Sequence, residues 1–184
     1  MTALPDDAGL VLTRLARSAI ATQLNLPAAE PDGEAEWLNE RGAAFVTLTI
    51  DGRLRGCIGS LEAWRWLGED VRSNAVSAAF RDPRFPPLSR DEFAQVDVEV
   101  SVLTPPQELS FTSEADALAQ LRPDIDGVIL EAGSHRATFL PQVWEDLPDK
   151  RVFMAHLKRK ARLAADYWGD DVRLHVYQVS AFHE

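Results

Sequence analysis

Hydrophobic positions at the start of the chain repeat with the spacing of a helix. Leu12, Leu15 and Ala16 fall on one face of residues 8–24, which predicts a packing helix there. Residues 27–36 are acidic and include two prolines and a glycine, a composition typical of a solvated loop. Neither segment carries candidate chemistry.

The pattern then changes from helical spacing to strand composition. Residues 43–50 are rich in β-branched and aromatic side chains, which favour strands. Asp51-Gly52 follows, a pair that tolerates positive φ at both central positions of a tight turn. Residues 53–59 then form the return strand of a predicted β-hairpin.

Helical and strand patterns continue to the end of the chain. They predict helices over residues 67–80 and 150–165, strands over 96–103 and 172–179, and a second hairpin that joins 127–131 to 136–140. A chain of 184 residues normally makes one domain, here spanning 1–184. Pro105-Pro106 ends a strand, and we predict a smaller subdomain from there, over about residues 105–145.

Composition narrows the class of protein. The chain is 46% hydrophobic and 26% charged, which is ordinary for a globular protein, and no segment approaches the length of a membrane span. A single cysteine excludes an internal disulfide and is consistent with a reducing compartment. With no secretory signal evident at the N-terminus, we predict a cytoplasmic protein without membrane association.

Charge argues against broad nucleic-acid binding. The net charge is −10, whereas non-specific binding to phosphates requires a positive surface. Residues 156–162 are nevertheless basic. Cations near a helix C-terminus complement the helix dipole, which explains this run without a ligand. A site for phosphate or an acidic partner is the alternative.

The cysteine lies in the stretch that carries the strongest candidate chemistry. Arg55 and Cys57 fall on the same face of a strand, and a guanidinium near a thiol favours the nucleophilic thiolate. Gly56 and Gly59 lack side chains, so a ligand or another backbone segment can approach closely. The alternative interpretation is that Cys57 is a small buried hydrophobe and the glycines mark a bulge.

Two further stretches contribute candidate residues. Three prolines between residues 83 and 87 stiffen a loop that holds Arg81, Arg84 and Phe85, which favours an anion-binding or substrate-positioning role. Alternatively, this loop only stops a helix, and its arginines pair with nearby acids. Glu99, on the polar side of a valine-rich strand, could act as a base or hold an arginine, although surface strands carry such residues routinely.

The sequence offers no recognisable metal or cofactor motif. Its four histidines are scattered and form no pair at the spacing of metal ligands. It has neither a phosphate-binding glycine loop nor a nucleophile elbow. We therefore predict no metal and no cofactor.

Six stretches of the chain carry distinctive motifs. They are residues 54–59 (LRGCIG), 79–85 (AFRDPRF), 99–103 (EVSVL), 126–130 (DGVIL), 137–144 (ATFLPQVW) and the helix that contains Lys160. In this order, from about residue 43 to residue 184, they resemble the AMMECR1 family.

The resemblance implies an α+β fold: an antiparallel sheet flanked by helices, with a larger lobe, a smaller lobe and a cleft between them. The motif residues expected to line that cleft are Arg55, Cys57, Arg81, Asp82, Arg84, Phe85 and Thr138, with Glu99 and Lys160 as further candidates. Bacterial and archaeal members are similar to one component of a three-part system, whose companions are a Memo-like protein and a radical SAM protein. The resemblance names no reaction.

Two functional hypotheses follow. In the first, the protein is an enzyme or a component of that modifying system, with Cys57 as nucleophile or covalent carrier and Arg55 and Glu99 assisting it. Gly56, Gly59, Arg81, Asp82, Arg84, Phe85, Thr138 and Lys160 would then bind the substrate. In the second, it is a binding or adaptor module that holds a small molecule, peptide, nucleotide or partner protein. RNA recognition has support only from the basic helix and Phe85.

Overall fold

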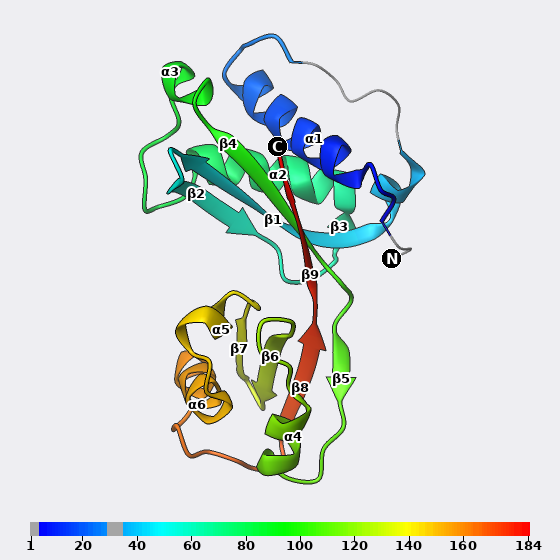
Figure 1. Cartoon of the computed structure of the whole chain (residues 1–184), viewed down its shortest axis with the longest axis vertical. Helices are drawn as coiled ribbons and strands as arrows, with labels where there is room; N and C mark the ends of the chain where they lie inside the picture. Colours follow the sequence, from blue (N-terminus) through cyan, green and yellow to red (C-terminus); the bar gives the residue numbers. More distant parts are fainter. Residues whose placement is uncertain (1–3, 29–34) are drawn as a thin grey trace. The chain divides into compact units, whose positions relative to one another are not determined.

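The computed structural model describes residues 4–28 and 35–184, so most of the predicted loop at 27–36 lies outside the described residues. The chain divides into two compact units. The second unit is Pro105–Val179, and the first contains the chain before it together with Ser180–Glu184. Each unit combines helices with an antiparallel sheet, and the predicted α+β class is confirmed (Figure 1).

The first unit is built on a five-stranded sheet. Its strands are β1 (Arg41–Ile50), β2 (Arg53–Gly59), β3 (Arg65–Trp66), β4 (Asp97–Leu103) and β9 (Val179–His183). The order β2-β1-β4-β9 makes β2 an edge strand, while β3 pairs with the beginning of β1. A short 3-10 helix, η1 (Glu36–Asn39), precedes β1, and α3 (Arg90–Phe93) precedes β4.

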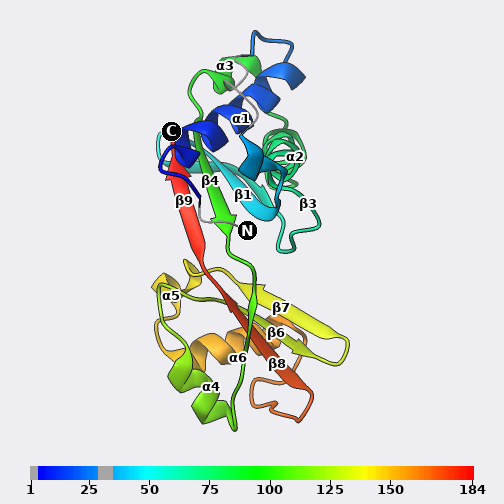
Figure 2. The same cartoon turned by 90° about the vertical axis from the view of Figure 1, so that its right-hand side faces the viewer.

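Two helices cover one face of this sheet, as both views show (Figures 1 and 2). They are α1 (Ala8–Gln23) and α2 (Leu67–Phe80), which match the predicted helices closely. They bury alternate side chains of the central strands, among them Val46, Leu48, Val98 and Val100. Residues at the intervening positions, including Thr47 and Glu99, therefore lie on the opposite face, which these helices leave uncovered.

The predicted hairpin is confirmed, with one irregularity. Asp51 and Gly52 adopt φ values of 52° and 72°, as the turn requires. The pairing then shifts between Leu48 and Thr49, so Arg55 has no partner in β1. This β-bulge adds one residue to β2 and pairs Cys57 with Thr47.

The second unit has a four-stranded sheet in the order β5-β8-β6-β7. Its elements are β5 (Gln107–Leu109), α4 (Glu114–Gln120), β6 (Gly127–Ala132), β7 (His135–Phe139), α5 (Val143–Asp146), α6 (Lys150–Lys160) and β8 (Val172–Tyr177). The helices pack on one face of the sheet (Figure 2). There, Trp144 stacks on Phe153 with ring centroids 3.6 Å apart. The unit extends beyond the range 105–145, because α6 and β8 complete its core.

Two predicted boundaries were wrong. The helix expected over residues 150–165 ends at Lys160, and Arg162 adopts a left-handed φ of 63° that a helix cannot continue through. The single strand expected over 172–179 is two strands. β8 pairs with β6, whereas β9 pairs with β4 in the other sheet, a difference that side-chain alternation cannot reveal. No helix among the described residues is long and apolar enough to span a membrane.

Candidate functional site

The peptide group of Cys57 is held from outside the sheet. Its N–H donates to Asp82 Oδ2 at 2.9 Å, and its carbonyl accepts a hydrogen bond from Arg84 Nη2 at 3.2 Å. Because these bonds lead away from β1, Cys57 and Thr47 form a non-hydrogen-bonded pair, the kind that brings opposite side chains closest. Thr47 Oγ1 donates to the partly exposed Cys57 Sγ at 3.3 Å.

Asp82 and Arg84 form the ion pair that holds this peptide. Arg84 Nε lies 2.9 Å from Asp82 Oδ1 and Nη2 lies 2.7 Å from Oδ2, a bidentate arrangement. Hydrogen bonds from Arg84 hold the pKa of the Asp82 carboxyl well below its usual range, despite burial, and the same bonds raise the pKa of Arg84. The Asp82 side chain is 1% exposed and that of Arg84 is 53% exposed. A buried, ionised carboxylate therefore anchors a half-exposed guanidinium beside Cys57.

Arg55 contacts other partners. Its Nε and Nη2 bond to the Glu92 carboxylate at 2.9 and 3.2 Å, and Nη2 also bonds to Pro86 O at 3.0 Å. These hydrogen bonds are the main reason that the pKa of Glu92 falls to about 2. Glu92 also closes a capping box with Ser89 at the start of α3. Arg55 thus ties β2 to the segment before β4, and Arg84 is the arginine that contacts Cys57.

The proline-rich loop carries the remaining first-unit candidates. Phe85 lies close to two guanidinium groups, with Arg55 Cζ 5.8 Å and Arg84 Cζ 5.6 Å from its ring centroid. Arg81 is exposed and forms no side-chain hydrogen bond or ion pair with the residues that the structure describes. The loop therefore carries one arginine held by an ion pair, Arg84, and one exposed arginine without such a partner among the described residues, Arg81.

The two glycines beside Cys57 allow close packing within the protein. A Cβ on Gly56 would lie 2.2 Å from Ala78 O in α2, and a Cβ on Gly59 would lie 2.2 Å from Phe45 Cγ. Gly56 thus lets another backbone segment approach, one of the two uses that the sequence indicated. The contact places β2 directly against α2.

Glu99 lies in a row with Cys57, although it does not contact the sulfur. Thr47 pairs with Cys57 on one side and with Glu99 on the other, so these side chains follow one another across the uncovered face. Glu99 accepts a hydrogen bond from Ser101 at 3.0 Å, and His183 Nδ1 on β9 lies 3.4 Å from its other oxygen. Sequence reasoning missed Thr47 and His183, because only the strand register brings them to this row.

Thr138 and Lys160 meet within the second unit. Lys160 Nζ donates to Thr138 O at 2.9 Å and lies 5.0 Å from the Phe139 ring centroid. Thr138 Oγ1 is 3.0 Å from the hydroxyl of Tyr177, whose pKa is raised by burial. The ring of Tyr177 packs against Gly127, where a Cβ would lie 2.4 Å from it. Within the second unit, these residues form a polar cluster that includes a tyrosine not predicted from the sequence.

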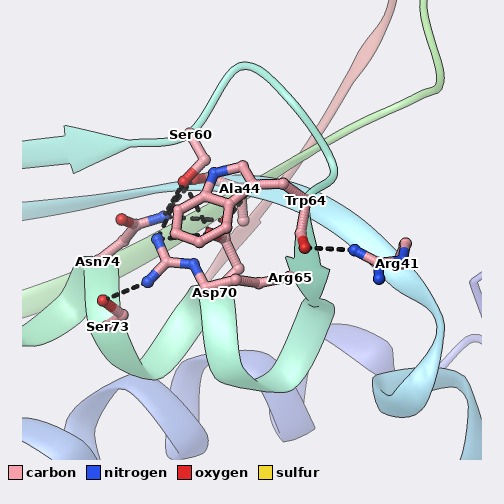
Figure 3. A network of polar contacts seen from close by, with 8 residues as sticks. All are labelled: Arg41, Ala44, Ser60, Trp64, Arg65, Asp70, Ser73 and Asn74. Atoms are coloured by element: carbon pink, nitrogen blue, oxygen red, sulfur yellow. Dashed lines mark hydrogen bonds and ion pairs between the residues drawn. The ribbon is translucent and has the colours of Figure 1, made fainter.

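A buried polar network fixes the far end of β2 (Figure 3). Asp70 of α2, which is fully buried, accepts hydrogen bonds from Ala44 N at 3.0 Å, Ser60 Oγ at 2.7 Å and Asn74 Nδ2 at 3.0 Å. Arg65 Nη2 forms an ion pair with it at 3.0 Å. Ser60 directly follows β2, so this network secures the strand that carries Cys57. Among the described residues, no cluster of three or more potential metal ligands occurs.

Comparison with known proteins identifies the family. A model of the AMMECR1 family matches residues 13–182. This chain belongs to the AMMECR1 family. A protein of Methanothermobacter thermautotrophicus is 40% identical to it, over 98% of this chain and 96% of that protein. Protein MJ0810 of Methanocaldococcus jannaschii is 35% identical, over 100% of this chain and 94% of its own.

A solved structure has the same fold as this AMMECR1-family chain. It is the crystal structure of the uncharacterized protein PH0010 from Pyrococcus horikoshii, with a TM-score of 0.84 and 34% sequence identity. The match covers 98% of this chain and 93% of that one. The predicted family and fold are both confirmed.

Proposed function

We propose that this AMMECR1-family protein is one component of a three-part modifying system with a Memo-like and a radical SAM protein, and that Cys57 is its nucleophile or covalent carrier. One observation supports the role of Cys57 most directly. The pair of the buried Asp82 and the half-exposed Arg84 bonds both polar groups of the Cys57 peptide, which fixes a partly exposed thiol beside a guanidinium. Rigid support of this kind is what a reactive group requires.

The surrounding residues fit the handling of an anionic group by a thiol. Arg84 uses Nε and Nη2 in the bonds to Asp82 and Cys57, while Nη1 takes part in none of the hydrogen bonds formed among the described residues. Nη1 and the exposed Arg81 are thus available to a carboxylate or phosphate, which planar guanidinium groups bind well. Thr47 orients the sulfur. Together they would position an electrophile for attack by the Cys57 thiolate.

The reactivity of Cys57 tests this role. At pH 7 and low ionic strength, the native thiol is expected to react with iodoacetamide about threefold faster than in the urea-unfolded protein, because it is partly exposed and lies beside the Arg84 guanidinium, which attracts its anionic form. Labelling is measured by intact mass, which is unambiguous with one cysteine. Arg84→Met should remove the difference, whereas Arg72→Met on α2 should retain it. A native thiol that reacts tenfold more slowly than the unfolded one would overturn the proposed role.

An adaptor function is the second candidate, and one observation favours it. Within the described residues, no histidine or carboxylate is hydrogen-bonded to Cys57 Sγ, so no general base touches the thiol. In an adaptor, Cys57 would only complete the packing of β2, and the exposed face would bind a peptide, nucleotide or partner protein.

Co-purification distinguishes the two candidates. We expect the tagged wild-type protein to retain its Memo-like and radical SAM companions, and intact mass to show an adduct on Cys57 when all three act together. Cys57→Ser should retain the companions and lose the product of the system. If Cys57→Ser supports full product formation, the adaptor function is correct. If neither companion is retained at physiological salt, membership of the system is rejected.

A further inference from the structure

Charged groups of opposite sign lie on either side of Cys57, one beyond the outer edge of β2 and one on the uncovered face of the sheet. Arg84 lies at the outer edge of β2, and Glu99 lies two strands away on β4. Cys57 and Thr47 occupy the positions between them. Building on the proposed role of Cys57, we infer that its substrate is an extended zwitterion, with an anionic group bound at Arg84 and a cationic group bound at Glu99.

Arg84, the group that would bind the anionic end of the substrate, is fixed in place. Arg84 is bonded to a carboxylate that is 1% exposed, so its position beside Cys57 depends on the core of the protein rather than on a mobile side chain. Asp82 neutralises part of the Arg84 charge, but the exposed Arg81 adds a further cation on the same loop. An anion at this edge would gain hydrogen bonds as well as charge attraction.

The group that would bind the cationic end of the substrate is the carboxylate of Glu99, which is partly buried. The Glu99 side chain is 23% exposed, and Ser101 holds one of its oxygens. His183, 71% exposed, approaches the other oxygen from β9, and it can move aside because little packs around it. Asp97 lies on the same face two residues earlier and is exposed, which adds negative charge. A partly desolvated carboxylate attracts an ammonium more strongly than a fully exposed one.

The spacing of the strands sets the length of the ligand. Neighbouring strands lie about 4.8 Å apart, so the Cys57 and Glu99 backbones are separated by about 10 Å. The two charges of a single amino acid are too close together to reach both groups. An extended tripeptide spans about 10 Å. With its C-terminal residue over Cys57, such a ligand would direct its carboxylate outward to Arg84 and its amine toward Glu99.

Activated tripeptides test this arrangement. The probe is Gly-Gly-Cys whose thiol is joined to 2-thiopyridine as a disulfide. The Cys57 thiolate attacks the peptide sulfur, a new disulfide forms, and the released electron pair leaves with pyridine-2-thiolate, which is followed by its absorbance. Matched probes carry an acetylated amine, an amidated carboxylate or both, and Cys-Gly-Gly reverses the polarity.

The free peptide is expected to react about tenfold faster than the doubly capped one at low ionic strength, since each charge contact contributes about threefold. Each rate is divided by the rate of the same probe with glutathione. Arg84→Met should abolish the effect of capping the carboxylate. If that variant unfolds, Arg81→Met is used instead and should reduce the effect, because it removes the second cation and leaves Arg84 in place. Glu99→Gln should abolish the effect of capping the amine. The matched charge controls Arg72→Met and Glu69→Gln on α2 should preserve both effects.

Two failures have different meanings. If the free, acetylated, amidated and doubly capped Gly-Gly-Cys probes all react with Cys57 more slowly than with glutathione, the thiol is inert and the proposed function itself fails. If the probes react readily but capping has no effect, or if Cys-Gly-Gly matches Gly-Gly-Cys, the thiol is functional and only the zwitterionic substrate is rejected.

Discussion

Replacing Asp70 with alanine is expected to lower the free energy of unfolding by about 4 kcal/mol. The substitution removes the counterion of Arg65 inside the protein, and breaking a buried pair in this way typically costs about 3–5 kcal/mol. It also leaves the Ala44 N–H and the Ser60 hydroxyl without their acceptor. Urea unfolding followed by tryptophan fluorescence measures the change in the free energy of unfolding.

The neighbouring residue provides the control for Asp70. Glu69 is an exposed carboxylate in the same turn of α2, and Glu69→Ala is expected to change the unfolding free energy by less than about 0.5 kcal/mol. Asp70→Ala should also alter the iodoacetamide reactivity of Cys57, because Ser60 ends the strand that carries it. A loss below about 1 kcal/mol would mean that the network contributes little to stability.

Replacing Gly56 with alanine is expected to cost about 3 kcal/mol and to disturb Cys57. The added methyl group would lie 2.2 Å from Ala78 O, and backbone atoms cannot move aside as the end of a flexible side chain can. The strand must therefore shift away from α2, which weakens the bonds from Cys57 to Asp82 and Arg84. Urea unfolding measures the loss, and the labelling rate of Cys57 reports the displacement.

Gly52→Asn is the matched glycine control. Gly52 has a φ of 72°, which asparagine tolerates, and no atom of the described residues lies within 4 Å of the point that a Cβ would occupy. We expect a change of less than about 0.5 kcal/mol and unaltered labelling. If Gly56→Ala behaves like this control, then β2 is free to move relative to α2, and the rigid support proposed for Cys57 is absent.

For the proline-rich loop, one of the two interpretations that the sequence allowed is confirmed in part, and the other stays a prediction. Arg84 pairs with a nearby acid, as the structural interpretation required, because Asp82 is buried and needs a counterion. The same arginine is half exposed beside Cys57, and its role in binding an anion stays a prediction. Local sequence shows that the loop is stiff. It does not show that the Asp82 carboxylate caps the outer edge of β2, since that contact joins residues 25 positions apart.

Local sequence determined much of this protein. The Asp51-Gly52 turn, the apolar faces of α1 and α2 and the alternation in β4 follow from backbone preferences and periodicity, which act between near neighbours. The motifs then indicated the family and, through it, the α+β fold. The sequence could not show that the segment expected as one final strand is two strands, β8 and β9, in different sheets, because side-chain alternation is the same in either sheet.

Tertiary structure decided which way Cys57 faces. The Asp51-Gly52 turn alone pairs Thr49 with Leu54, and the same register continued would place Cys57 opposite Val46, on the face buried under the helices. The bulge at Arg55 shifts the pairing by one residue, so Cys57 faces Thr47 on the uncovered side. That shift is held by Arg55 with Glu92 and by Gly56 against α2, contacts between distant parts of the chain. The sequence supplies the thiol, and long-range packing determines that it is partly exposed.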